Sequence, residues 1–232
     1  MSPGDGDGRC DVLSVDRKTG NVDIWYNKGV QGSVPTFSYK AGVVTGNKCT
    51  EGWGIGPFDF GVQFADVNGD GRVDYLCMEQ DGRTTGYLNT DSGLEDVGQI
   101  KRSEGHERAS HRWADVDGDG RADFLYTDIA TGDTIVWLNE GEKTSGDSAF
   151  TFQKIDNAFP KAVDQGANIH FVKMSNSGRA DMVRVLPDSG VAYTYFNECK
   201  NPNEGSDGPG PDDGSIVDPK LEVKADLCRS AA

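Results

Sequence analysis

The chain has 232 residues, five cysteines and a formal net charge of −15 at pH 7, a length that suits one large domain or two small ones. A surface this acidic repels nucleic acids and anionic membranes, which are therefore excluded as partners, and it attracts cations. No stretch is apolar enough to span a membrane. With 31 glycines and no clustering of helix formers, the composition favours short strands joined by tight turns.

A repeated motif organises the chain. A short copy, Asp5–Leu13, is followed by two closely matching copies, Phe64–Leu76 and Trp113–Leu125. The fourth copy, Phe171–Val183, carries fewer acidic residues. Each copy leads into an apolar strand, a polar turn, and a second strand that ends in an aromatic residue, any residue, and Asn. These second strands are expected at Val22–Asn27, Thr85–Asn89, Thr134–Asn139 and Val191–Asn197.

The spacing of the motif predicts the architecture. A further strand follows each hairpin, as at Val97–Lys101 or Phe150–Ile155, and successive loops begin about 49 to 63 residues apart, the size of a four-stranded propeller blade. We predict an all-β fold, a small or partial β-propeller with about four antiparallel blades, the first without its leading strand. The blades are placed near residues 4–60, 61–110, 111–165 and 166–199, followed by a Gly/Pro/Asp-rich linker at 200–214 and a tail at 215–232.

The second and third loops carry alternating oxygen side chains. The expected metal ligands are Asp66, Asn68, Asp70 and Asp74 in the second loop and Asp115, Asp117, Asp119 and Asp123 in the third, with the carbonyls of Arg72 and Arg121 in addition. Intervening glycines allow the loop to curl so that these oxygens converge. Calcium, which takes six to eight hard oxygen ligands, is the expected cation, whereas magnesium demands a tighter octahedron. The alternative is a metal-free set of Asx-turns, whose adjacent carboxylates would repel one another.

An EF-hand is disfavoured, because Cys77 and Tyr126 stand where it needs a Glu, and a strand follows instead of a helix. The fourth loop has Lys173 at its first position and serines at the next two ligand positions. We expect it to be metal-free and held by Asp181 and an ion pair of Lys173.

The first loop is incomplete within its own segment. Asp5, Asp7, Asp11 and the carbonyl of Arg9 match the ligand pattern, but Pro3 stands at the first position. The sequence Lys224–Leu227 resembles Phe64–Val67. One hypothesis is that this segment completes the first blade and that Asp226 supplies the missing ligand; the alternative is a disordered tail.

The cysteines show no CxxC pair and no Cys/His spacing, which disfavours a zinc site. We expect an oxidising compartment, with disulfides such as Cys49–Cys77 and Cys199–Cys228; the alternative is five reduced thiols. The first thirty residues contain no signal-peptide core, so an extracellular location is inferred only indirectly.

The motif Phe64–Leu76, followed by a hairpin that ends in Tyr-Leu-Asn, resembles the FG-GAP/VCBS repeat family. That family includes integrin α-subunit propellers and fungal propeller lectins, and the likeness is greatest to FG-GAP regions of secreted fungal proteins. The resemblance extends over residues 4–199. It implies a β-propeller, calcium in the loops, an extracellular setting and a binding or adhesive role. In fungi such regions are also attached to secreted hydrolases, including SGNH esterases.

No catalytic constellation is recognisable, so the protein is predicted not to be an enzyme. His106, His111 and His170 are the three histidines, and they form no triad order or HExxH motif. Gly146-Asp147-Ser148 is similar to an SGNH nucleophile block but lies in a polar segment between strands. Residue types alone leave a glycosidase open, although no pattern supports one.

Trp53 lies outside the repeat pattern, on a loop between blades, and is the predicted ligand-stacking residue; the alternative is a structural role. The other tryptophans align with strand aromatics and are expected to pack. The predicted function is a non-catalytic, extracellular calcium-binding module for a glycan or a protein. The alternatives are an ancillary domain of a secreted hydrolase and a structural subunit that associates through open strand edges.

Overall fold

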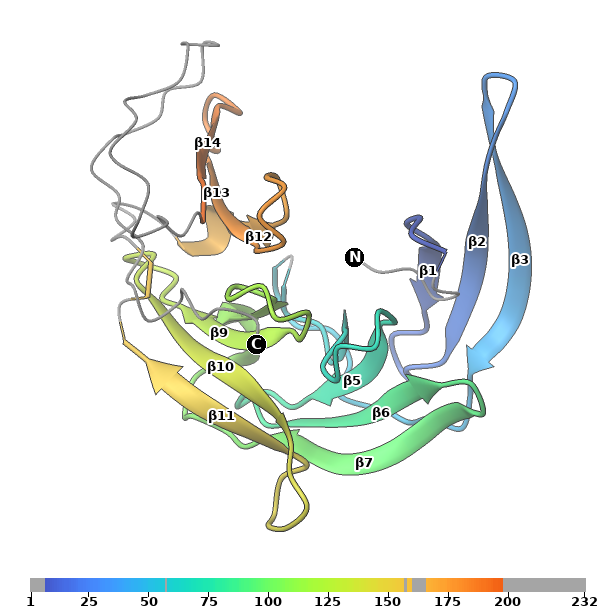
Figure 1. The fold of residues 1–232 in the computed structure, drawn as a ribbon, viewed down its shortest axis with the longest axis horizontal. Coiled ribbons are helices and arrows are strands. Elements are labelled where there is room, and N and C mark those ends of the chain that lie inside the picture. The colour runs from blue at the N-terminus through green and yellow to red at the C-terminus, as the bar shows by residue number, and fades with distance from the viewer. Residues whose placement is uncertain (1–6, 57, 157, 160–165, 198–232) are drawn as a thin grey trace.

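A computed structural model describes residues 7–56, 58–156, 158–159 and 166–197. Within these ranges the protein is nearly all β, with fourteen strands in four antiparallel sheets. Two short 3-10 helices lie at Arg108–Ser110 and Gly166–Asn168. The sheets follow one another along an open arc and do not close into a ring (Figure 1). The predicted all-β fold of antiparallel blades is confirmed as a partial propeller.

Each sheet runs in chain order from an inner to an outer strand. The first contains β1 (Val12–Val15), β2 (Val22–Gln31) and β3 (Val34–Val44). The second contains β4 (Val62–Ala65), β5 (Asp74–Met78), β6 (Thr84–Thr90) and β7 (Gly93–Lys101). The third contains β8 (His111–Ala114), β9 (Asp123–Thr127), β10 (Thr134–Glu142) and β11 (Phe150–Ile155). The fourth contains β12 (Ile169–Val172), β13 (Asp181–Val185) and β14 (Ala192–Tyr195).

The two central sheets have the four strands that the repeat predicts, and in the described residues the outer two sheets have three. The first sheet begins at β1, the counterpart of β5, so its leading strand is not among the described residues. Its hairpin is longer than the sequence indicated, because β2 continues past Asn27 to Gln31 and turns at Gly32, whose φ is 66°. This hairpin projects beyond the other blades (Figure 1).

The hydrophobic core lies mainly between neighbouring sheets. At the junction of the second and third sheets, Val67, Leu76 and Leu88 pack with Ala122 and Phe150. The junction of the third and fourth sheets is built in the same way, with the buried residues Val116, Leu125, Leu138, Ala180 and Met182. Val67 and Val116, which follow the first aspartates of the second and third loops, are part of this core, so these two loops are fixed at the junctions.

Hydrogen bonds to the backbone reinforce the junction of the second and third sheets, and equivalent bonds reinforce that of the third and fourth. Ala122 N donates to the carbonyl of Asp66 at 2.6 Å. The side chain of Asn139, at the end of the aromatic-x-Asn strand, donates to the carbonyls of Val67 at 2.8 Å and of Ala122 at 3.1 Å. The second loop is therefore held by the following blade as well as by its own.

The disulfide Cys49–Cys77 joins the segment between the first two sheets to β5, as predicted. Cys199 and Cys228 lie outside the described residues, so the second expected pair stays a prediction. In the part of the chain that the structure describes, no helix has the length and apolar character needed to cross a membrane.

Candidate metal centre

The third loop connects β8 to β9 and owes its curl to two glycines. Gly118 and Gly120 have φ angles of 84° and 92°, in the left-handed region that residues with a side chain rarely adopt. Gly118 N and Gly120 N both donate to the carboxylate of Asp115, at 2.7 Å and 3.3 Å. The loop therefore folds around its first acidic side chain.

Three predicted ligands of this loop come together. Carboxylate oxygens of Asp115, Asp117 and Asp123 lie within 4.8 Å of one another, and within the described residues no other group of three or more acids, histidines or cysteines does so. All three residues are buried, with exposed fractions of 7%, 5% and 0%. Hard oxygen donors that converge in a buried loop are a donor set that suits calcium.

The electrostatics of the cluster also fit a cation. Burial, together with the nearby Asp117, raises the pKa of Asp123 well above its ordinary value. Burial raises the pKa of Asp117 as well, and the neighbouring carboxylates of Asp119 and Asp115 add to the effect. The charged forms are therefore disfavoured in the protein alone, and a bound cation would favour them.

The fourth predicted ligand of this loop takes another partner. Asp119 forms an ion pair with the guanidinium of Arg121 and accepts a bond from Arg121 N at 2.8 Å. The structure therefore does not bring Asp119 into the cluster. The proposed role of the Arg121 carbonyl stays a prediction.

The fourth loop contributes a cation of its own. The expected ion pair of Lys173 is present, and its partner is Asp115 of the neighbouring loop, at 2.9 Å. Asp181 holds the fourth loop as expected, because its carboxylate accepts bonds from Met174 N, Ser175 N and Asn197 N at 2.8 Å each.

The second loop has the same curl with more exposure. Asp66 accepts bonds from Gly69 N and Gly71 N at 2.7 Å and 2.8 Å. Asp70 and Asn68 accept bonds from backbone N–H groups within the loop. Burial raises the pKa of Asp74 to about 6. The structure does not gather these acids into a close group, and the carbonyl of Arg72 stays a predicted ligand.

Only part of the first loop lies in the described residues. Asp7 forms an ion pair with Arg9, and Asp11 accepts a bond from Asn27 N at 2.8 Å. Asp5 and Asp226 lie outside the described residues, so their predicted role as ligands stays a prediction.

Trp53 is 40% exposed and packs edge-on against Phe60, with ring centroids 5.5 Å apart. Its loop is held firmly, because Arg108 Nε donates to Asp59 at 2.8 Å and the Asp59 carbonyl accepts from Gly54 N at 2.7 Å. The other tryptophans pack against aromatic neighbours, as expected.

Sequence reasoning missed a buried lysine. The ammonium of Lys101 lies 4.9 Å from the ring centroid of Trp137 and 5.2 Å from that of Phe124, and it pairs with Glu104. It also missed the bridging role of Asn139, although the Asn that recurs at the end of each second strand was the signal. Both features hold blades together, and Asn139 also contacts the acidic cluster, because its backbone N–H donates to Asp123 at 2.8 Å.

A family model for an FG-GAP-like repeat matches residues 66–126. This segment is an FG-GAP-like repeat. It begins at the first acid of the second loop and continues through the third loop into β9, so the FG-GAP-like repeat includes the acidic cluster. No curated protein matches the chain.

The chain is also similar to parts of two solved structures. One is the Photorhabdus luminescens Tc holotoxin pore, at a TM-score of 0.46 and 17% identity, covering 78% of this chain and 8% of that chain. The other is the TcdB2-TccC3-Cdc42 complex, at a TM-score of 0.42 and 16% identity, covering 80% of this chain and 8% of that chain. The protein thus spans a small part of the chains that it resembles.

Proposed function

We propose that this protein is a non-catalytic, extracellular calcium-binding module of the propeller type, and that it binds a glycan or a protein partner. The observation that carries the proposal is the buried group of Asp115, Asp117 and Asp123, whose oxygens lie within 4.8 Å of one another. The FG-GAP-like repeat at residues 66–126 supports it.

Calcium accounts for the cluster better than turn formation does. The fourth loop forms the same turn with Asp181 at the position of Asp123 and with Lys173 in place of Asp115. Asp115 and Asp117 add negative charge beside Asp123, and Lys173 offsets this charge only at Asp115. A bound calcium ion would supply a divalent charge and link the two ends of the loop.

The calcium proposal is tested by isothermal titration of the chelator-treated protein with Ca²⁺. Wild type is expected to bind, and the double variant Asp115→Asn/Asp117→Asn is expected to bind at least one ion fewer. Glu95→Gln, an exposed acid outside the loops, is the control and should keep the wild-type stoichiometry. Equal stoichiometry in wild type and the double variant would refute the site.

The absence of catalysis is part of the proposal. In the described residues His106 stacks on Tyr126 with ring centroids 3.8 Å apart, and His111 is buried against Phe124. The hydroxyl of Ser148 accepts a hydrogen bond from Gln99 Nε2 at 2.9 Å. These packing contacts favour structural roles, and the disulfide Cys49–Cys77 favours an oxidising, extracellular setting.

Partner binding is proposed for the loop that carries Trp53, because an exposed indole on a rigid support suits stacking on a sugar ring or an apolar side chain. A glycan array in calcium, with Trp53→Ala compared with wild type, tests the glycan arm. Ile55→Ala, which changes a residue of the same loop that is 94% exposed, is the matched control. If Trp53→Ala binds sugar as wild type does, Trp53 is not part of the glycan site. If wild type binds no sugar, a protein partner is the remaining proposal.

A further inference from the structure

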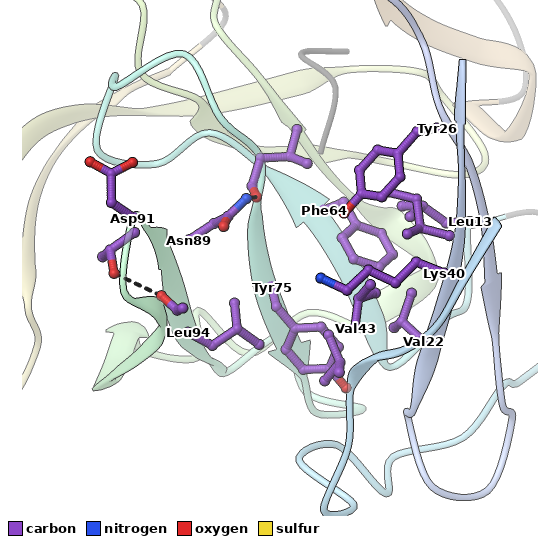
Figure 2. A pocket seen from close by; sticks show the side chains of 15 residues that line it. Leu13, Val22, Tyr26, Lys40, Val43, Phe64, Tyr75, Asn89, Asp91 and Leu94 are labelled. Carbon is purple, nitrogen blue, oxygen red and sulfur yellow. Dashed lines mark hydrogen bonds between the residues drawn. The ribbon is translucent and has the colours of Figure 1, made fainter. Parts of the chain in front are cut away.

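The junction between the first and second sheets contains a cavity of about 280 Å³. Figure 2 shows side chains of β1, β2 and β3 facing side chains of the second sheet across it. Leu13, Tyr26, Val73 and Asn89 line this cavity. When the strand registers of the sheets are aligned, these four residues correspond, in that order, to Leu76, Leu88, Ala122 and Asn139 at the junction of the second and third sheets. The same set of positions is therefore packed at one junction and open at the other.

The residue that fills the equivalent space is known at two junctions. It is Val67 at the second and Val116 at the third, each fully buried and each the last residue of an Ala-Asp-Val sequence that follows an inner strand. The first sheet, as far as it is described, begins at β1, which pairs only with β2. It therefore provides no counterpart of Val67.

At both of these junctions, two hydrogen-bond donors of the following blade bind the backbone carbonyls of the Asp-Val sequence. At the second junction, Ala122 N donates to the carbonyl of Asp66 and Asn139 Nδ2 to that of Val67, at 2.6 Å and 2.8 Å. At the third junction, Ala180 N and Asn197 Nδ2 make the equivalent bonds to Asp115 and Val116, both at 2.7 Å.

The counterparts of these donors at the first junction are Val73 N and Asn89 Nδ2. Within the described residues Asn89 Nδ2 donates only to the carbonyl of Val73, at 3.2 Å, and Val73 N has no acceptor from the first sheet. The cavity thus presents an apolar space and two N–H groups in the arrangement that binds an Ala-Asp-Val segment elsewhere in the molecule.

We propose that residues 225–227 of this chain, Ala-Asp-Leu, occupy the cavity as an added inner strand of the first sheet. They lie outside the described residues, and beyond 65–67 and 114–116 they are the remaining place where Ala-Asp is followed by Val or Leu. Leu227 fills the apolar space, and the carbonyls of Asp226 and Leu227 accept from Val73 N and Asn89 Nδ2. The chain after Asn197 is long enough, because about 27 extended residues span roughly 90 Å.

Strand docking does not require metal. The additional statement that Asp226 then supplies the first ligand of the first loop rests on the proposed calcium function. The two are separated by performing the experiment below in calcium and in chelator. A cross-link in both conditions supports docking whatever the outcome of calcium titration.

The experiment replaces Tyr26 with the photo-cross-linker benzoylphenylalanine in the full chain. Irradiation is expected to link position 26 to residues 225–227 at monomer mass, as read by peptide mass spectrometry. The matched control carries the same cross-linker at Tyr39, which is 54% exposed, packs against Trp25 and does not line the cavity, and it should not reach that segment. Cross-links to other segments, to a second chain, or to nothing would overturn the proposal.

A second measurement keeps the proposal falsifiable if the cross-linker disturbs folding. Leu227→Ala is expected to lower the melting temperature by roughly 4–10 °C, as a buried Leu→Ala change does in a chain of this size. Leu221→Ala, in the same tail but outside the matching segment, should change it by less than about 2 °C. Equal small effects of the two substitutions would contradict docking of Leu227.

Discussion

The third and fourth loops have the same hydrogen-bonded frame and different charge. In the third, Asp123 accepts bonds from Val116 N and Asn139 N, both at 2.8 Å. In the fourth, Asp181 accepts the equivalent bonds from Met174 N and Asn197 N. The third loop adds a close group of buried acids, whereas the fourth has Ser175 and Ser177, whose hydroxyls bond each other at 2.9 Å.

The difference shows that the turn and the acidic cluster are separable. The fourth loop forms its turn with one buried aspartate and has Lys173 and Ser175 at the positions of Asp115 and Asp117, so a turn of this kind forms without acids at these two positions. Their presence in the third loop raises the electrostatic free energy of the folded protein unless a cation joins them. This contrast is the main support for a metal role.

The largest expected effect tests the shared frame. Asp123→Ala leaves two backbone N–H groups without their acceptor and Asp181→Ala leaves three, and each substitution should lower the free energy of unfolding by about 2–5 kcal/mol. Urea denaturation in chelator measures this, and the two losses should be similar. In calcium the loss for Asp123→Ala should become the larger one, whereas equal losses in both conditions would contradict the comparison.

A pH-dependent difference is expected at the first residue of the inner strand, where the third blade has His111 and the fourth has Ile169. Burial lowers the pKa of His111 to about 4, whereas the unfolded value is about 6.5. Between pH 6.5 and 4, His111 is protonated in the unfolded chain and stays neutral in the folded protein. The contribution of neutral His111 to the free energy of unfolding is therefore fully present above pH 6.5, and it falls by up to about 3 kcal/mol as the pH drops to 4.

His111→Ile should remove this contribution. Urea denaturation of both proteins between pH 7.5 and 4 gives the difference between them, in which the titration of the buried aspartates cancels. The stability of the variant relative to wild type should rise as the pH falls. A difference that is independent of pH would show that His111 is not held neutral.

Making the third loop resemble the fourth sharpens the comparison further. Asp117→Ser/Asp119→Ser should leave the stability in chelator unchanged or higher, because it removes buried charge. The variant should lose the stabilisation that calcium gives wild type, about 2.7 kcal/mol at a calcium concentration 100 times Kd. Thermal denaturation with and without calcium measures both, and an undiminished calcium response would contradict the ligand assignment.

The smallest expected effect concerns Lys173, whose ammonium pairs with Asp115 of the third loop. The side chain is about half exposed, so the pair is worth little. Lys173→Met removes a competing cation and should raise the calcium affinity of the third loop roughly two- to fivefold in a titration. Weaker calcium binding in this variant would mean that Lys173 orients Asp115 for the metal.

Periodicity was sufficient to predict the blades and the turns, because a repeat compared with itself shows which residues share a position, whereas the Cys49–Cys77 disulfide was expected from the number of cysteines and an oxidising compartment. Periodicity was also sufficient to place Asp115, Asp117 and Asp123 in one loop. It overestimated the convergence at Asp119, since the spacing of acids does not show that the guanidinium two residues later competes for that carboxylate.

The sequence alone did not predict which residues of neighbouring blades contact each other. The Lys173–Asp115 ion pair joins residues of different repeats, and no local pattern relates them. The length of the β2–β3 hairpin was also missed, although polar residues alternate with Phe37 and Tyr39 in β3, a pattern that favours an extended strand.

The central claim is that the buried acids of the third loop bind calcium, and the melting temperature of the wild-type protein tests it most directly. Differential scanning calorimetry in excess chelator and again with millimolar Ca²⁺ should give a clearly higher melting temperature with calcium, by mass action on the folded state. The same concentration of Mg²⁺ should raise it less. A melting temperature that is the same in chelator and in calcium would contradict the account.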